Sequence, residues 1–67
     1  MIRLNGQDSD VRAGETVAAV LRHLELSPEA RGIAVAVDGE VVPRAEWESF
    51  GLAEHAHVEV LTAMQGG

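Results

Sequence analysis

Apolar and polar residues alternate at the beginning of the chain, which is typical of a strand with one buried face. In residues 1–5, Ile2 and Leu4 fall on one side, and polar side chains occupy the other. Residues 6–8 predict a turn because they are rich in turn-forming types. A shorter and weaker strand is therefore expected at residues 9–12.

The next apolar residues have the spacing of a helix. One face of it would carry four residues at i, i+3, i+4 and i+7, namely Val17, Val20, Leu21 and Leu24. Thr16 is expected to cap this helix, since its hydroxyl can accept a bond from a free backbone N–H. Ala18 is expected to face away from the core. Ser27-Pro28-Glu29 could cap one further helical turn, with Pro28 at its first position and Gly32 at its end.

A hairpin is expected after the helix. Residues 33–37 form an apolar run that suits a strand, and Asp38-Gly39 follows it. This pair favours a two-residue type I′ turn, in which both central residues have positive φ. Residues 41–42 would form the returning strand. Pro43 lacks an N–H for a ladder, so that strand is short or lies at an edge.

A last strand is expected at residues 57–63, after a helical turn at residues 45–50. The order of elements indicates an α+β fold, with one main helix on one face of a mixed sheet of about five strands. The order also fits the ubiquitin-like β-grasp, in which the first and last strands lie side by side in the centre. We interpret residues 1–67 as a single domain that ends in a flexible C-terminal tail, residues 64–67.

One helix leaves the opposite face of the sheet open, and alternation places small apolar residues there. They are Ala34, Ala36, Leu61 and Ala63. A contiguous exposed apolar cluster often marks an interface, so we expect a partner surface. The alternatives are that loops cover these residues or that the alanines only allow close strand packing.

Composition excludes several classes of function. The formal net charge of −6 counts against nucleic acid and anionic membranes, which both require basic patches. No apolar run approaches the ~20 residues of a membrane span, and no secretion signal is apparent. With no cysteine, disulfides and thiolate metal sites are excluded, and a cytoplasmic location is expected. All five cations are arginine, so no lysine amine is available for an isopeptide bond.

The most informative chemical feature is the pair Gly66-Gly67. Glycine has no side chain to pack and is narrow and conformationally free. Preceded by Gln65, the pair could thread a partner's active site and present the carboxylate of Gly67 there. His55 and His57 are too few for a metal site, and no motif of nucleophile, acid–base or phosphate chemistry occurs. We therefore expect no catalytic residue, no metal and no bound cofactor.

Residues 33–47, IAVAVDGEVVPRAEW, closely resemble the sulfur carriers of thiamine biosynthesis, the ThiS family. That family has a similar Val-Val-Pro-Arg hairpin followed by Trp, a strand like residues 58–63, and a terminal Gly-Gly. The likeness covers nearly the whole chain, and its Pro-Arg-x-x-Trp element is the most discriminating part. Asp38 stands where the family commonly has Asn, and Glu54-His55 where it commonly has a Gly-Asp turn.

The resemblance implies a mechanism and a set of partners. A ubiquitin-activating-like adenylyltransferase would use ATP to adenylate the carboxylate of Gly67. A cysteine desulfurase would supply sulfur, which converts Gly67 to a thiocarboxylate. Thiazole synthase would then take this sulfur into the thiazole ring of thiamine.

Three other functions remain open at this point. The chain could be a carrier like the small subunit of molybdopterin synthase, although the Pro43-Arg44 and Trp47 element argues against it. It could be a ubiquitin-like modifier joined to protein lysines. It could also be a simple binding module with an incidental tail.

Overall fold

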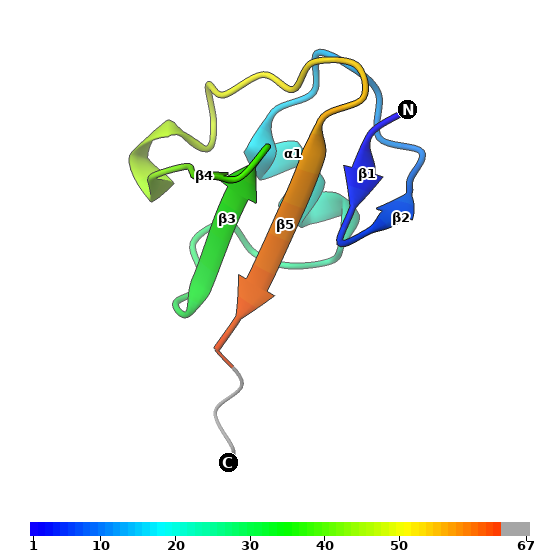
Figure 1. The fold of residues 1–67 in the computed structure, drawn as a ribbon. Helices are drawn as coiled ribbons and strands as arrows, with labels where there is room; N and C mark the ends of the chain where they lie inside the picture. Colours follow the sequence, from blue (N-terminus) through cyan, green and yellow to red (C-terminus); the bar gives the residue numbers. More distant parts are fainter. Residues whose placement is uncertain (64–67) are drawn as a thin grey trace.

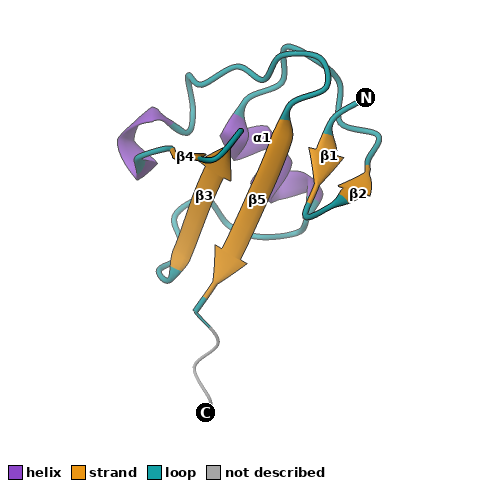
Figure 2. Cartoon of the chain, viewed as in Figure 1, coloured by secondary structure: helices purple, strands orange, loops and turns teal. Residues whose placement is uncertain are grey.

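A single α-helix packs against one face of a five-stranded mixed sheet in the computed structural model, which describes residues 1–63 (Figure 1). The strand order is β2-β1-β5-β3-β4, with β1 and β5 parallel and the other pairs antiparallel. Figure 2 shows the helix behind the sheet. The elements are β1 (Arg3–Leu4), β2 (Gln7–Asp8), α1 (Val17–His23), β3 (Ile33–Val37), β4 (Glu40–Val41), the 3₁₀ helix η1 (Arg44–Glu46) and β5 (His57–Thr62). The predicted α+β fold, with first and last strands adjacent, is confirmed.

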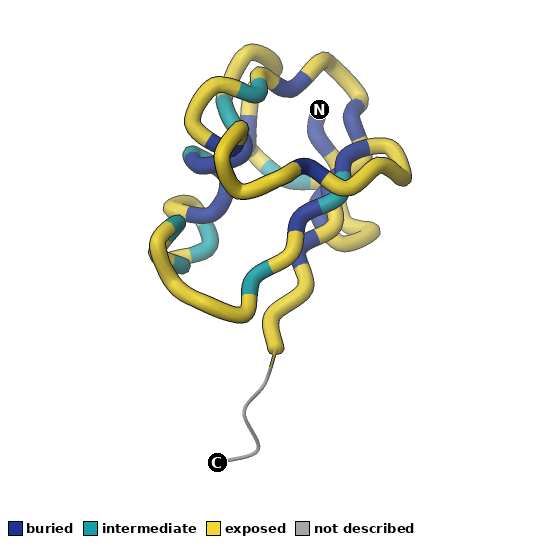
Figure 3. Tube along the Cα trace, turned by 90° about the vertical axis from the view of Figure 1, so that its left-hand side faces the viewer, coloured by how far each residue is buried: buried dark blue, intermediate teal, exposed yellow. Residues whose placement is uncertain are grey.

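The core lies between α1 and the sheet. In β5, Val58 and Val60 are buried while the residues between them are exposed, as the predicted alternation requires. Figure 3 shows this change from buried to exposed along the chain. The largest fully buried side chains are Ile2, Leu21, Val17, Val20, Val35 and Val58. The core is therefore built almost entirely from aliphatic residues.

Each free N–H at the start of α1 has an acceptor. Thr16 Oγ1 accepts from Ala19 N at 3.1 Å, so the predicted cap is confirmed. Val17 N donates to Phe50 O at 3.0 Å, and Ala18 N donates to Trp47 O at 2.9 Å. The segment after η1 thus closes over the beginning of the helix.

Ala18 is completely buried, so the prediction that it faces away from the core was wrong. The sequence period marks the stripe that faces the sheet, but α1 is also covered on a second side. Trp47, itself buried, lies there and accepts the Ala18 N–H. A small residue is needed where helix and loop approach so closely.

The further helical turn expected between Pro28 and Gly32 does not form. Helix α1 ends in a Schellman motif, because Glu25 N donates to Arg22 O and Leu26 N donates to Leu21 O. Glu25 has the left-handed φ of +63° that this motif requires. Ser27 then accepts the backbone N–H of Glu29 and forms a turn in place of a helix.

The first hairpin differs from the prediction. Asn5 and Gly6 are its turn residues, with φ of +53° and +84°, and β2 follows at once instead of at residues 9–12. Asn-Gly strongly favours such a turn, and this signal outweighed the alternation that extended the strand through Asn5. Asn5 Oδ1 also accepts from Val60 N at 2.8 Å, which joins the turn to β5.

The second hairpin forms as predicted, with φ of +51° at Asp38 and +87° at Gly39. Strand β4 begins one residue earlier than expected, and Val42 N still donates to Val35 O at 2.8 Å. Asp38 Oδ1 accepts from His57 N at 2.9 Å. An asparagine could accept the same bond through its Oδ1, so Asp38 fills this one role of the Asn common in the resembling family.

Candidate functional site

The sheet face opposite α1 carries all four residues that the sequence predicted for a partner surface. Ala34 and Leu61 are paired across β3 and β5, and Ala36 lies two residues further along β3. Leu61 is 69% exposed, Ala34 and Ala63 are also exposed, and Ala36 is half-buried. No described loop covers this cluster from the solvent side.

Val41 belongs to the same surface and was not among the predicted residues. It pairs with Ala36 across β3 and β4 and is 76% exposed. The two-residue turn at Asp38-Gly39 fixes this pairing, so the signal was present in the sequence. The open apolar face therefore comprises Ala34, Ala36, Val41, Leu61 and Ala63.

Charged residues border the open apolar face on the side away from Ala63. Glu59 precedes Leu61 by two positions on the same side of β5. Arg3 lies on the neighbouring β1. Its Nη1 is 3.6 Å from Asp8 Oδ1, and its Nη2 donates to Gly6 O at 2.6 Å. The exposed sheet surface thus changes from polar to apolar toward the end of β5.

The end of β5 is held by the residue that precedes β3. Ala63 N donates to Gly32 O at 2.6 Å, and this contact lies next to the pairing of Ile33 with Thr62. Gly32 has a φ of +78°. The predicted site residues Gln65, Gly66 and Gly67 lie outside the described residues.

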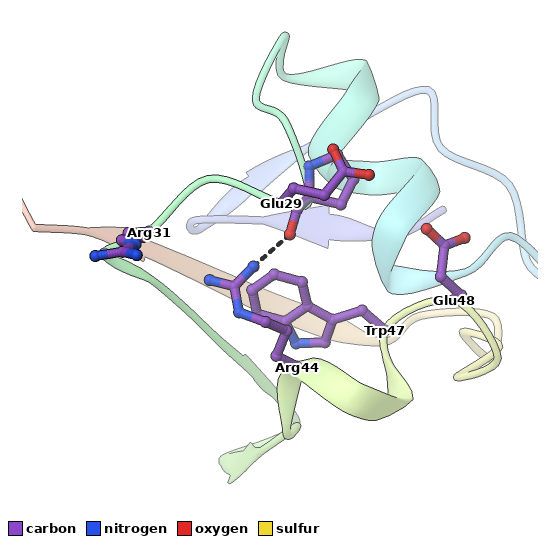
Figure 4. A pocket seen from close by; sticks show the side chains of 7 residues that line it. Glu29, Arg31, Arg44, Trp47 and Glu48 are labelled. Atoms are coloured by element: carbon purple, nitrogen blue, oxygen red, sulfur yellow. Dashed lines mark hydrogen bonds between the residues drawn. The ribbon is translucent and has the colours of Figure 1, made fainter.

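The Pro-Arg-x-x-Trp element builds a second surface beside this contact, and Gly32 belongs to both. Trp47 is buried, and its Nε1 donates to Val42 O at 2.9 Å. The Arg44 guanidinium lies 4.5 Å from the centre of the Trp47 ring and donates to Pro28 O and, at 2.7 Å, to Ala30 O. Figure 4 shows this stacking in an open pocket of about 630 Å³, with Arg31 set apart from the other labelled side chains. Arg44 therefore ties the loop before β3 to η1.

Within the described part of the chain, His55 and His57 belong to no group of three or more potential metal ligands. His55 lies in the loop before β5 with a φ of +68°, and its Nδ1 is 4.0 Å from the carboxylate of Glu54. His57 begins β5. Among residues 1–63, no group of three or more His, Asp or Glu side chains could hold a metal ion. In the same part of the chain, no helix is long and apolar enough to cross a membrane.

Comparison with known protein families gives a direct result. The model of the ThiS family matches residues 2–67. The chain belongs to the ThiS family. The resemblance first seen in residues 33–47 is thereby confirmed, and membership supports the role of a sulfur carrier in thiamine biosynthesis.

Solved ThiS structures share the fold. The crystal structure of a thiamine biosynthesis protein (ThiS) from Geobacter metallireducens is 26% identical, with a TM-score of 0.75 over 98% of this chain and 97% of that chain. An NMR structure of a thiamine biosynthesis protein from the same organism is 29% identical, with a TM-score of 0.75 over 98% of this chain and 86% of that chain. A search of curated proteins found no match.

Proposed function

We propose that this ThiS-family chain carries sulfur on the carboxyl group of Gly67 and donates it for thiazole formation. The observation that carries the proposal is the family match, because it extends to residue 67 and so includes Gly66-Gly67. The proposal is supported by the place of β5, which lies in the centre of the sheet and ends at Thr62, five positions before Gly67 in the sequence.

The proposed chemistry begins with activation of a poor electrophile. A ubiquitin-activating-like adenylyltransferase joins the Gly67 carboxylate to AMP and releases pyrophosphate from ATP. A persulfide formed by a cysteine desulfurase then attacks the acyl carbon, and AMP leaves. A thiol reduces the resulting acyl disulfide at its S–S bond, which frees the thiocarboxylate, and thiazole synthase consumes it. The chain itself supplies no cysteine or lysine that could capture the activated carboxyl group.

We further propose that the open apolar face docks onto the activating enzyme and onto thiazole synthase in turn. Leu61 and Val41 are the large exposed apolar residues of this face, and Ala63 at its end leads into the tail. A small surface suits exchange between partners, which requires moderate affinity.

The decisive test follows the mass of the chain. Purified protein with the activating enzyme, ATP and inorganic sulfide should gain the mass difference between sulfur and oxygen, and fragmentation should place it at Gly67. With sulfide, the nucleophile displaces AMP directly and no reductant is needed.

Two matched variants serve as controls in that test. A chain that lacks Gly67, and a chain with one serine added after it, should fold normally and gain no sulfur. If the extended chain is sulfurated equally well, the free carboxyl group of Gly67 is not the acceptor. Conjugates of higher mass in lysates, in place of thiocarboxylate, would favour a protein modifier.

A further inference from the structure

Gly32 and Ala63 are so close that a side chain at position 32 would crowd Ala63 and require a shift of a few tenths of an ångström. A Cβ added to Gly32 would lie 3.2 Å from the Ala63 Cβ, which is tighter than ordinary van der Waals contact. The Gly32 carbonyl also accepts the Ala63 N–H at 2.6 Å. Gly32 therefore fixes both the position of the Ala63 backbone and the space beside it.

The loop that carries Gly32 is itself held in place by the side chain of Arg44. The Arg44 guanidinium donates to the carbonyls of Pro28 and Ala30, and it is stacked on the buried Trp47. These bonds restrain the loop on the approach to Gly32. A continuous set of contacts thus joins the core, through Trp47 and Arg44, to the residue that holds Ala63.

Ala63 is the last residue before the tail, so its backbone direction sets where the tail begins. Four residues span at most roughly 13 Å at about 3.3 Å per residue, so the position of Ala63 limits how far from the sheet the carboxylate of Gly67 can reach. Positional errors of about 1 Å can slow a reaction by up to about a hundredfold. Restraint at Ala63 is therefore of use to a chain that must deliver its own carboxylate.

We propose that Gly32 is a positioning residue for the sulfur-transfer reaction, because it fixes the position of Ala63, the point from which the tail must reach the active site of the partner enzyme. Arg44 supports this position of Ala63 by holding the loop before β3, which contains Gly32. The inference rests on the proposed function, and it assigns a role to the Pro-Arg-x-x-Trp element that docking on the open apolar face does not explain.

The test compares two glycines that share one conformation. Gly32→Ala introduces a positive-φ strain and a close contact with Ala63, whereas Gly39→Ala introduces a similar strain at φ of +87° with nothing within 4 Å. Gly39 lies in the hairpin at the other end of β3. Urea unfolding should show a loss of stability for both variants from the shared positive φ, with a further loss for Gly32→Ala from the contact with Ala63. Any difference in sulfur transfer then reports on Ala63 and not on strain.

Initial rates of thiocarboxylate formation, measured over a range of carrier concentrations, should separate docking from delivery. For Gly32→Ala we expect kcat to fall about tenfold, with KM changed by less than about twofold, because the docking face is intact. Gly39→Ala should retain both constants. The double variant Gly32→Ala with Ala63→Gly should recover most of kcat, since it removes the atom that is crowded, while its stability stays reduced by the remaining positive φ.

Three outcomes would overturn the inference: equal losses of kcat in both glycine variants, no recovery in the double variant, or a folded Gly32→Ala chain with unchanged kcat. If Gly32→Ala does not fold, Ala63→Pro removes the donated N–H without altering Gly32 and should lower kcat in the same way; a normal kcat there also overturns the inference. Failure of the proposed function is distinct, because the unaltered chain would then form no thiocarboxylate.

Discussion

Leu61→Glu tests whether the open apolar face binds the activating enzyme. Leu61 is 69% exposed and pairs with the small Ala34, so its side chain contributes little to the core. The exchange to glutamate should therefore change the free energy of unfolding by less than about 0.5 kcal/mol. A larger loss of affinity for the activating enzyme would therefore come from the open apolar face and not from a loss of folded protein.

The expected loss of affinity follows from the exposed area of Leu61. Complete burial of a leucine side chain stabilises by about 1.5–3 kcal/mol. Since Leu61 is 69% exposed, roughly 1–2 kcal/mol of this remains available to a partner. Substitution by glutamate removes this favourable burial and introduces a carboxylate that must be desolvated when the partner binds. We expect the dissociation constant to rise at least tenfold, which corresponds to about 1.4 kcal/mol.

Titration calorimetry with the activating enzyme measures this change, and circular dichroism verifies the fold of each variant. Leu61→Ala removes apolar area without adding charge and should give a smaller loss. Ala53→Glu adds the same charge in the loop before β5, at the opposite end of that strand from Ala63, and should bind normally. An unchanged affinity for folded Leu61→Glu would refute the reasoning and place the interface at the tail and its neighbouring loops.

Two further predictions concern stability and are measured by urea unfolding. Leu21→Ala should cost about 2–5 kcal/mol because Leu21 is completely buried under the sheet, and a loss below about 0.5 kcal/mol would mean that its packing is misjudged. Glu25→Gly should stabilise the chain by about 0.5–1 kcal/mol, since Glu25 holds the left-handed position of the helix end, while Glu15→Gly, at a residue without positive φ, should not stabilise it. Equal effects of the two glycine substitutions would show that the φ of Glu25 carries no cost.

Local signals in the sequence predicted most of the framework. The Thr16 cap, the helix period and the Asp38-Gly39 turn each depend on residues close together in the chain. The alternation in β3 and β5 predicted which side chains lie on the open apolar face. The sequence could predict these features because none of them depends on contacts between distant segments of the chain.

The errors came from contacts between distant segments or from competing local signals. Ala18 is buried because Trp47 covers it, and a helix period contains no information about a segment 29 positions away. The first hairpin was misplaced because alternation and the Asn5-Gly6 turn gave conflicting boundaries. The role of Arg44 was invisible, since its acceptors, Pro28 and Ala30, are backbone carbonyls that any residue type would supply.

The position of β5 in the sheet has a consequence for the synthesis of this protein. Strand β5 lies between β1 and β3, yet it follows both of them in the chain. Until it emerges, the hairpins β1–β2 and β3–β4 have no strand to join them, and an isolated hairpin is marginally stable at best. A nascent chain therefore exposes apolar residues until β5 has left the ribosome. The sheet closes only after β5 is added, so the fold of residues 1–63 depends on the last of its described strands.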